Sequence, residues 1–329
     1  MRVLAPLLSI CFFALLWLRI MWTGRYLRKP LTRSLYMSAM GRVGLTGNHG
    51  DEDEEMAGTR SKYGEWYTVN QSRLREDLRA LLQENELDES TRAFLANSTT
   101  KSGWLFTQLY YSMVSSLLGF FVSRTSVNGV LGRGSMFVLS AEQFRRLLGI
   151  PESWRADSLL DLGAGDGEVT AIMGAHFNQV FVTEVSPTMQ WRLRKRNFTV
   201  LGVTEWNTVY DRPYDLVSCL NLLDRCERPL TLLREVRQVL RPGSGRLLLA
   251  VVLPYRPYVE RGGRWEQPSE CVSVHGDSWE EQLNSLVIDV LQPNGFQVES
   301  FTRVPYLCEG DLYNDHYVLD DAVLLLKPV

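Results

Sequence analysis

The sequence predicts an α/β protein built on a seven-stranded, mostly parallel, doubly wound sheet with an N-terminal helical extension. Three observations support this class. A glycine-rich turn follows a short apolar run in residues 159–170, LLDLGAGDGEVT; strand-like and helix-like runs alternate from Ser158 onward; and apolar residues recur at helical spacing before that point. We therefore expect a sheet domain over residues 158–329 and a helical extension over residues 65–157.

The seven strands are expected at residues 158–162, 180–185, 198–202, 215–220, 246–253, 296–304 and 317–326. Helices are expected between them at residues 170–175, 187–196, 228–240 and 279–292. Each of the first five strands is followed by a crossover, so these five should run parallel, whereas the last two read as an antiparallel pair at the sheet edge.

The preceding region contains two apolar patterns at helical spacing, which predict a helical cap on the sheet domain. These are Leu74, Leu78, Leu81 and Leu82, and then Leu105, Leu109, Met113, Leu117 and Phe121. Ser140 with Gln143 predicts a capped helix start. The glycine-rich loop before it, GVLGRGSMF, carries Arg133 and Ser135 and either closes over a ligand or only links two helices.

The amino end differs in kind from the rest. Residues 3–18 are almost wholly apolar, basic residues flank them, and no Asp or Glu precedes Asp51. Residues 1–34 are therefore expected to form a signal, membrane anchor or targeting segment, giving membrane association, and residues 35–64 a linker. We expect the endoplasmic reticulum or endomembrane system first and the mitochondrion second.

Composition excludes several classes. The net charge is −3 and no basic block alternates with aromatic residues, so nucleic acid is not an expected partner. The five cysteines are odd in number and contain no C-x-x-C pair, and no histidines stand beside them, so no metal site is expected.

The glycine turn indicates a nucleoside cofactor. Gly163 and Gly165 let the backbone turn tightly against a ligand, while Glu168 replaces the last glycine of the dinucleotide pattern. Asp161 and Asp166 would repel a pyrophosphate. S-adenosyl-L-methionine, which carries an ammonium, a sulfonium and ribose hydroxyls, fits this turn.

An acidic residue ends the second strand. Glu184 stands about twenty residues after the turn, where a carboxylate can accept from both hydroxyls of a ribose. The alternative is a surface glutamate at a strand end. An NAD site would share this acid, so Glu184 indicates a nucleoside and not a reaction.

The fourth strand ends in SCLNLLDRC, which puts Asn221 and Asp224 at the carboxyl edge of the sheet. The pair suits the orientation of a nitrogen nucleophile, although Asp224 could instead cap a turn beside Arg225. The block RVPYLCEGDLYND, with Tyr306, is expected to line the same edge and to suit a cationic or imidazole-bearing acceptor. A solvated hairpin loop is the alternative for this block.

Four segments together resemble the DREV-type protein histidine methyltransferases of the class I superfamily, from about Trp66 to Val329. They are LLDLGAGDGEVT, CLNLLDRC, GRGSMF and PYLCEGDLYNDHYVLDDAVLLLKP. The resemblance implies transfer of a methyl group from S-adenosyl-L-methionine to Nδ1 of histidine in His-x-His stretches of proteins or peptides, where x is small, leaving S-adenosyl-L-homocysteine. It also implies that Glu184, Asn221 and Tyr306 contact the cofactor and that Asp224 holds the acceptor imidazole.

The expected site therefore has three parts. Cofactor contacts are expected from Asp161, Gly163, Gly165, Glu184, Asn221 and Tyr306; catalytic roles from Asp224 and Asn221; and substrate contacts from Asp224, Glu309, Asp311 and Tyr313. If Asp224 accepts from Nε2–H of the imidazole, Nδ1 is left free to attack. Two alternatives stay open, namely a small-molecule imidazole N-methyltransferase and a non-catalytic S-adenosylmethionine-binding module.

Overall fold

The computed structural model describes residues 63–118, 124–208, 213–261, 264–311 and 313–329. The expected targeting segment at 1–34, nearly all of the expected linker at 35–64, and Phe121 lie outside these residues. Within the described part of the chain, no helix combines the length and apolarity needed to cross a bilayer.

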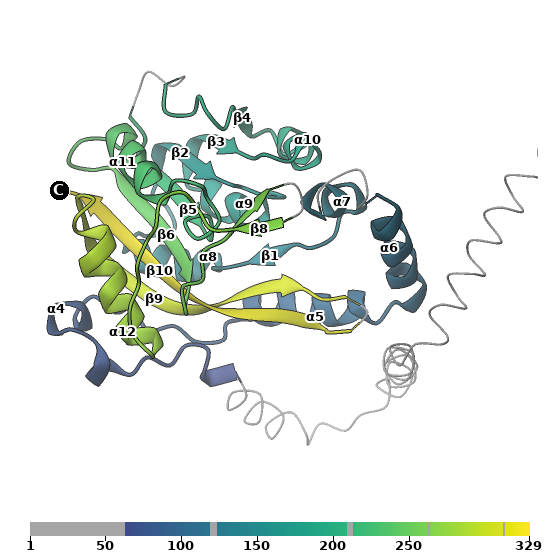
Figure 1. The fold of residues 1–329 in the computed structure, drawn as a ribbon, viewed down its shortest axis with the longest axis horizontal. Helices are drawn as coiled ribbons and strands as arrows, with labels where there is room; N and C mark the ends of the chain where they lie inside the picture. The colour runs from purple at the N-terminus through teal and green to yellow at the C-terminus, as the bar shows by residue number, and fades with distance from the viewer. Residues whose placement is uncertain (1–62, 119–123, 209–212, 262–263, 312) are drawn as a thin grey trace, which may run out of the picture.

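One large mixed sheet organises the molecule (Figure 1). Its strands are β1 (Met136–Phe137), β2 (Ala156–Leu162), β3 (Phe177–Thr183), β4 (Thr199–Leu201), β5 (Leu216–Leu220), β6 (Arg246–Val252), β9 (Phe296–Glu309) and β10 (His316–Pro328). They stand in the order β1-β9-β10-β6-β5-β2-β3-β4. The strands β2 to β6 are parallel to one another, whereas β10 is antiparallel to both β6 and β9.

All seven expected strands are present in this sheet, and the closing hairpin is β9–β10. The expected count of seven was nevertheless one too low. The two-residue strand β1 pairs with β9, joining Met136 to Cys308 and Phe137 to Leu307. A separate small hairpin, β7 (Val259–Arg261) with β8 (Arg264–Glu266), follows β6 and was also not expected.

The four expected crossover and flanking helices are confirmed. They are α9 (Glu168–Gly174), α10 (Pro187–Lys195), α11 (Pro229–Val239) and α12 (Trp279–Ser285), which continues into the π-helical turn η2 (Leu286–Leu291). Ser186 caps α10, and Ser278 with Glu281 forms a capping box on α12. These polar side chains satisfy amide groups that a helix start leaves unpaired.

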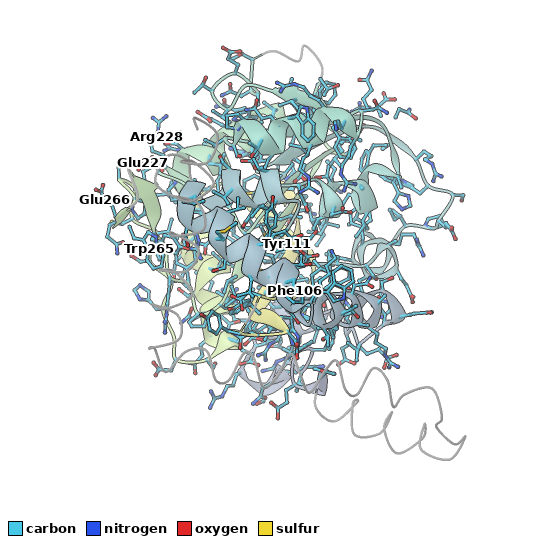
Figure 2. All side chains as sticks on the ribbon, turned by 90° about the vertical axis from the view of Figure 1, so that its right-hand side faces the viewer. Phe106, Tyr111, Glu227, Arg228, Trp265 and Glu266 are labelled. Atoms are coloured by element: carbon cyan, nitrogen blue, oxygen red, sulfur yellow. The ribbon has the colours of Figure 1, made fainter. Side chains whose placement is uncertain are left out.

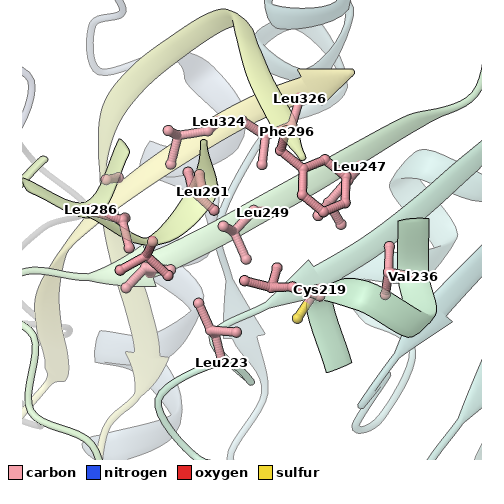
Figure 3. Packing of buried hydrophobic residues seen from close by; sticks show 14 of the residues in the cluster. Cys219, Leu223, Val236, Leu247, Leu249, Leu286, Leu291, Phe296, Leu324 and Leu326 are labelled. Carbon is pink, nitrogen blue, oxygen red and sulfur yellow. The ribbon is translucent and has the colours of Figure 1, made fainter. Parts of the chain in front are cut away.

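The core lies on both faces of the sheet, because alternate residues of a strand point to opposite sides. Along β6, Leu247 and Leu249 join the cluster under α11, α12 and η2, whereas Leu248 and Ala250 join the cluster on the other face. Figure 3 shows the first of these clusters, with Leu249 close to Leu291 and Leu247 close to Phe296. The sheet is thus held rigid, and its carboxyl edge is a fixed platform for a site.

The N-terminal extension departs from the expectation in two places. Its elements are η1 (Gln71–Arg73), α4 (Glu76–Arg79), α5 (Glu89–Ser102), α6 (Leu105–Leu118), α7 (Arg124–Leu131) and α8 (Ala141–Leu148). The first leucine pattern forms only one turn of helix, because Leu82 leaves it to bridge to Phe301 of β9. In the second pattern, α6 packs against α7, and Met113 and Leu117 are exposed instead of covering the sheet.

Candidate active site

The glycine turn joins β2 to α9 at the carboxyl edge of the sheet. Gly163 and Gly165 have backbone φ values of +75° and +57°, which residues other than glycine rarely adopt. The Gly163 amide donates to the Thr183 carbonyl of β3 at 3.0 Å. No atom comes within 4 Å of the place where a Cβ on Gly165 would stand. The turn is therefore anchored at its start and leaves open space at its middle.

Asp161 lies beneath this turn and not at its surface. It is buried, and its two carboxylate oxygens accept hydrogen bonds from the hydroxyls of Thr170, at 2.5 Å, and Ser218, at 2.7 Å. Burial raises the pKa of Asp161 to about 6, against the effect of both hydroxyl donors. Asp161 consequently ties β2 to α9 and β5 and fixes the position of the turn.

Glu184 follows β3 and stands beside the glycine turn. Its Oε2 accepts from the Gly165 amide at 3.0 Å, and its Oε1 accepts from the Ser186 amide at 2.8 Å. Each carboxylate oxygen has a further lone pair. The carboxylate is thus fixed in orientation and can still accept from a pair of neighbouring hydroxyls.

Asn221 follows β5 and adopts a left-handed backbone, with φ of +54°. Its amide donates to the Ala250 carbonyl of β6 at 2.9 Å, which holds this conformation. Its side-chain Nδ2 donates to Oδ2 of Asp321 on β10 at 2.8 Å, whereas its buried Oδ1 has no hydrogen-bond partner. Strained residues of this kind cluster at functional sites.

Asp321 is a site residue that the sequence reasoning missed. It is fully buried, Oδ1 has no partner, and burial raises the pKa of the carboxyl well above its usual range. Burial disfavours the charged form of this carboxyl. The available signal was an acid in the middle of an otherwise largely apolar strand, YVLDDAVLLL.

Asp224 lies beyond β5 and is only 3% exposed. Its Oδ2 pairs with the guanidinium of Arg225, which lies over the ring of Tyr258 at 3.9 Å. Its Oδ1 is buried without a hydrogen-bond partner. Burial raises the pKa of Asp224 to about 6, although Arg225 opposes this. A buried carboxylate oxygen without a donor marks a position where a ligand N–H can bind.

Tyr306 on β9 belongs to the same cluster. Burial raises its pKa first of all, and the nearby Cys308, Asp321 and Asp224 raise it further. Its hydroxyl contacts the sulfur of Met136 on β1. The expectation that Tyr306 shares the edge of the sheet with Asn221 and Asp224 is consistent with these interactions.

Glu309 connects three elements. Its Oε2 accepts from the amides of Gly134, at 2.9 Å, and Ser135, at 3.1 Å, and its Oε1 pairs with Lys101 of α5. The Ser135 hydroxyl in turn donates to Asp166 of the glycine turn at 2.9 Å. The loop GRGS is thus bound to the turn and to β9, so it does more than link two helices.

Asp311 and Tyr313 lie at the tip of the β9–β10 hairpin, away from Asn221. Asp311 accepts from the Tyr313 amide at 2.8 Å and from the Tyr317 hydroxyl at 2.8 Å. The tip lies on α5, where Ser98 donates to the Asp315 carbonyl at 2.6 Å (Figure 1). The structure therefore brings Tyr306 to the buried acids and leaves Asp311 and Tyr313 on an outer rim.

A sheet in this order, with a closing antiparallel hairpin and a glycine turn after its first long strand, is the fold of class I methyltransferases. The model of the DREV methyltransferase family matches residues 66–328. The chain belongs to the DREV methyltransferase family. This family uses S-adenosyl-L-methionine as its methyl donor, which confirms the expected cofactor and the expected reaction class.

Solved structures show a distant likeness to this DREV methyltransferase. The glycopeptide N-methyltransferase MtfA with bound S-adenosyl-L-methionine is 16% identical, covering 58% of this chain and 87% of that chain at a TM-score of 0.37. The YcgJ protein from Bacillus subtilis is 14% identical, covering 53% and 93% at 0.36. A chain of the complex between the Haloferax volcanii Trm112 methyltransferase activator and a methyltransferase is 18% identical, covering 39% and 60% at 0.30, so this protein spans less than two thirds of its length.

The residues of the site fit S-adenosyl-L-methionine. The Glu184 carboxylate can accept from ribose hydroxyls, and the open space at Gly165 admits a ligand close to the backbone. The unpartnered Oδ1 of Asn221 can accept from an ammonium or a hydroxyl. A pyrophosphate would instead face the carboxylates of Glu184 and Asp166, which repel it.

Proposed function

We propose that this DREV methyltransferase transfers the methyl group of S-adenosyl-L-methionine to Nδ1 of histidine in His-x-His stretches of proteins, where x is a small residue. The observation that supports this most is the buried, unpartnered Oδ1 of Asp224 at the carboxyl edge of the sheet. This oxygen can accept a hydrogen bond from an imidazole N–H. The resemblance to the DREV-type protein histidine methyltransferases assigns the same role to Asp224.

Asp224 would select the tautomer of the acceptor. The cofactor, when bound, supplies a methyl group on a sulfonium. By accepting from Nε2–H, the Asp224 carboxylate leaves the lone pair of Nδ1 free to attack. Methyl transfer forms the Nδ1–C bond as the C–S bond breaks, and the imidazole becomes a cation that Asp224 stabilises. The Nε2 proton leaves afterwards to solvent, so no strong base is needed before attack.

Other residues would hold the reactants in place. Glu184 and Asn221 are proposed to bind the cofactor, with Asp161 fixing the turn from below and Asp321 fixing the Asn221 side chain. Tyr306, which lies near Asp224 and Asp321, would close one wall of the imidazole pocket. Positioning and electrostatics would then supply most of the rate enhancement.

The three residues expected to contact substrate from the β9–β10 hairpin, Glu309, Asp311 and Tyr313, are given different roles. Glu309 is engaged with Gly134, Ser135 and Lys101, so its proposed part is to hold the loop in place. Asp311 and the exposed Tyr313 would meet residues that flank the His-x-His stretch.

The decisive experiment compares peptides that contain His-Ala-His with matched Ala-Ala-His peptides and with free imidazole dipeptides, and mass spectrometry locates the methyl group. The proposal expects methylation at Nδ1 in the His-Ala-His peptide only. Preferential methylation of the free dipeptides would instead establish a small-molecule N-methyltransferase. Absence of cofactor binding in a calorimetric titration would contradict both enzymatic functions and leave a non-catalytic fold.

The proposed compartment is the endoplasmic reticulum or endomembrane system, with the mitochondrion second, on the basis of the apolar amino end. Imaging of a carboxyl-terminally tagged full chain beside markers of both organelles tests this. A glycosidase treatment of the three Asn-x-Ser/Thr sites then reports which side of the membrane the body occupies.

A further inference from the structure

The helix α6 presents a continuous apolar stripe that no part of the described chain covers. Its members are Phe106, Tyr110, Met113 and Leu117, exposed by 86%, 53%, 40% and 61%. Spacings of four, three and four residues bring all four onto one face of a helix. Trp104, directly before the helix, is 57% exposed as well. Figure 2 shows Phe106 on the face of the molecule that lies to the right in Figure 1.

This stripe is not a face of the protein core. The helix α6 packs against α7, which in turn contacts α10, and among the described residues neither the sheet nor the hairpin lies over its apolar side. The opposite side of α6 carries Thr107, Gln108 and several serines, with Gln108 donating to the Lys101 carbonyl at 3.0 Å. The helix is therefore amphipathic with its apolar side outward.

The sequence on either side of α6 is basic. Between Glu89 and Glu142 the sequence contains no Asp or Glu, whereas it contains Arg92, Lys101, Arg124 and Arg133. The helix itself has no charged residue. Lys101 pairs with Glu309, whereas Arg92, Arg124 and Arg133 are basic residues that a surface of anionic lipid attracts.

The length of α6 suits a helix that lies on a bilayer surface and is too short for one that crosses the bilayer. Fourteen residues of α-helix extend about 21 Å, less than the roughly 30 Å of the hydrocarbon core. The aromatic residues of the stripe and the tryptophan before it are of the kind that interfacial helices insert between lipid headgroups.

The described part of the chain begins beside α5, the helix that leads into α6. Tyr63, the first described residue, packs with Trp66 against Leu95 of α5 and Leu307 of β9, and α5 leads directly into α6. The sequence before Tyr63 carries the apolar run 3–18 with its basic flank.

We propose that α6 is a membrane-docking helix, which binds a bilayer surface containing anionic lipid through Trp104, Phe106, Tyr110, Met113 and Leu117. A docked helix constrains how the folded body is oriented on the bilayer surface. Docking by α6 fixes its orientation and puts the β9–β10 hairpin, which lies on α5, next to the lipid (Figure 1). Protein segments that emerge from that membrane would then be presented to the carboxyl edge of the sheet.

The test is hydrogen–deuterium exchange on the full chain, because this readout separates α6 from the amino-terminal segment. Exchange is measured without vesicles, with phosphatidylcholine vesicles, and with vesicles that also contain phosphatidylserine. Amides of α6 should exchange roughly tenfold more slowly with the anionic vesicles only, while amides of α11 stay unchanged. The double variant F106S/L117S should lose this protection, whereas Val203→Ser, an exposed valine after β4, should keep it.

Three results would overturn the proposal. The first is unchanged exchange of α6 in the protein bound to anionic vesicles, or no binding to them. The second is protection that rises with protein concentration in the absence of vesicles, which would show a second copy on α6. The third is protection by a His-Ala-His peptide alone, which would show a substrate-docking helix.

Discussion

The two ends of the site differ in how their polar groups are satisfied. At the β2–β3 end, Asp161 accepts from two hydroxyls and Glu184 from two amides. At the β5–β10 end, one side-chain oxygen on each of Asn221, Asp224 and Asp321 is buried without any partner. At the first end the carboxylates are hydrogen-bonded without a ligand. At the second end three buried oxygens have no donor among the described residues.

This difference separates binding from chemistry. A completed network is rigid and can receive a cofactor without rearrangement. Buried acceptors without donors cost stability, and a ligand that supplies donors recovers that cost only in the bound complex. We infer that the glycine turn and Glu184 are preformed, whereas Asn221 and Asp224 gain their missing donors only when the cofactor and the substrate are bound.

The largest expected effect is from Gly165→Arg. The arginine would fill the open space at the turn, so cofactor affinity should fall by more than about a hundredfold and turnover should vanish. Calorimetric titration with S-adenosyl-L-methionine measures this. Gly243→Arg is the matched control, because Gly243 also has a positive φ and open space but lies far from the site. Normal affinity in Gly165→Arg would mean that the turn does not meet the cofactor.

Asp224→Asn should lower turnover by roughly 100- to 1,000-fold, because an amide cannot stabilise the imidazole cation as a carboxylate does. Cofactor affinity should stay near that of the native chain, since Glu184 and the glycine turn are unchanged. Steady-state kinetics with the His-Ala-His peptide, beside the titration, measures both. Asp320→Asn, at a partly exposed acid paired with Arg303, is the control. Native turnover in Asp224→Asn would remove Asp224 from the acceptor site.

Asp224→Asn should also be more stable to unfolding than the native chain. Burial raises the pKa of Asp224 from 3.8 to about 6, so the folded state binds a proton more tightly than the unfolded state does. Stability from this group is therefore present below about pH 4 and is lost as the pH rises through about 6. At neutral pH the loss is on the order of 3 kcal/mol, which the uncharged amide of the variant avoids. Thermal unfolding at pH 7 should show a rise of a few degrees, and a fall would contradict the burial argument.

A smaller effect is expected in the pH profile of turnover. Below about pH 6 both Asp224 and the substrate imidazole become protonated. In a plot of log turnover against pH, the slope of the acid limb should therefore exceed one for the native enzyme. The slope should be lower by one in Asp224→Asn. Asp161 also has a pKa of about 6 and is present in both proteins, so it cancels from the comparison. Equal slopes would show that Asp224 does not titrate in the cycle.

The smallest expected effect is from Asp321→Asn. Burial favours the uncharged form of the Asp321 carboxyl, and an amide is uncharged and keeps an acceptor oxygen for Asn221 Nδ2, so turnover should fall only a few-fold, or roughly 1 kcal/mol. Asp321→Leu removes the acceptor of Asn221 Nδ2 and should raise KM for the cofactor more than it lowers kcat. Complete loss of activity in Asp321→Asn would mean that the ionised carboxylate is required.

Much of the fold could be predicted from local pattern. Each of the seven expected strands is an apolar run bounded by a turn, and such runs are visible without knowledge of their neighbours. The strand β1 could not be found this way, since two residues carry no periodicity and its pairing with β9 spans the whole domain. The leucines at 74–82 follow helical spacing, yet the bridge from Leu82 to Phe301 overrides it.

The site was predictable where it lies at strand ends. Glu184, Asn221 and Asp224 follow β3 and β5 closely, so strand positions alone bring them to one edge. Asp321 was missed because its burial depends on β9 and β6 flanking β10. The loop contacts of Glu309 depend on the same long-range register, which the local sequence does not contain.

The Ser135 hydroxyl donates to Asp166 of the glycine turn, and the amides of Gly134 and Ser135 donate to Glu309 of β9. These bonds join the glycine turn to the β9–β10 hairpin. A ligand that restrains the turn therefore also restrains the hairpin. Two ligands that bias one shared element alter each other's affinity by the same factor. Cofactor and substrate should accordingly bind cooperatively, each lowering the Kd of the other by the same factor.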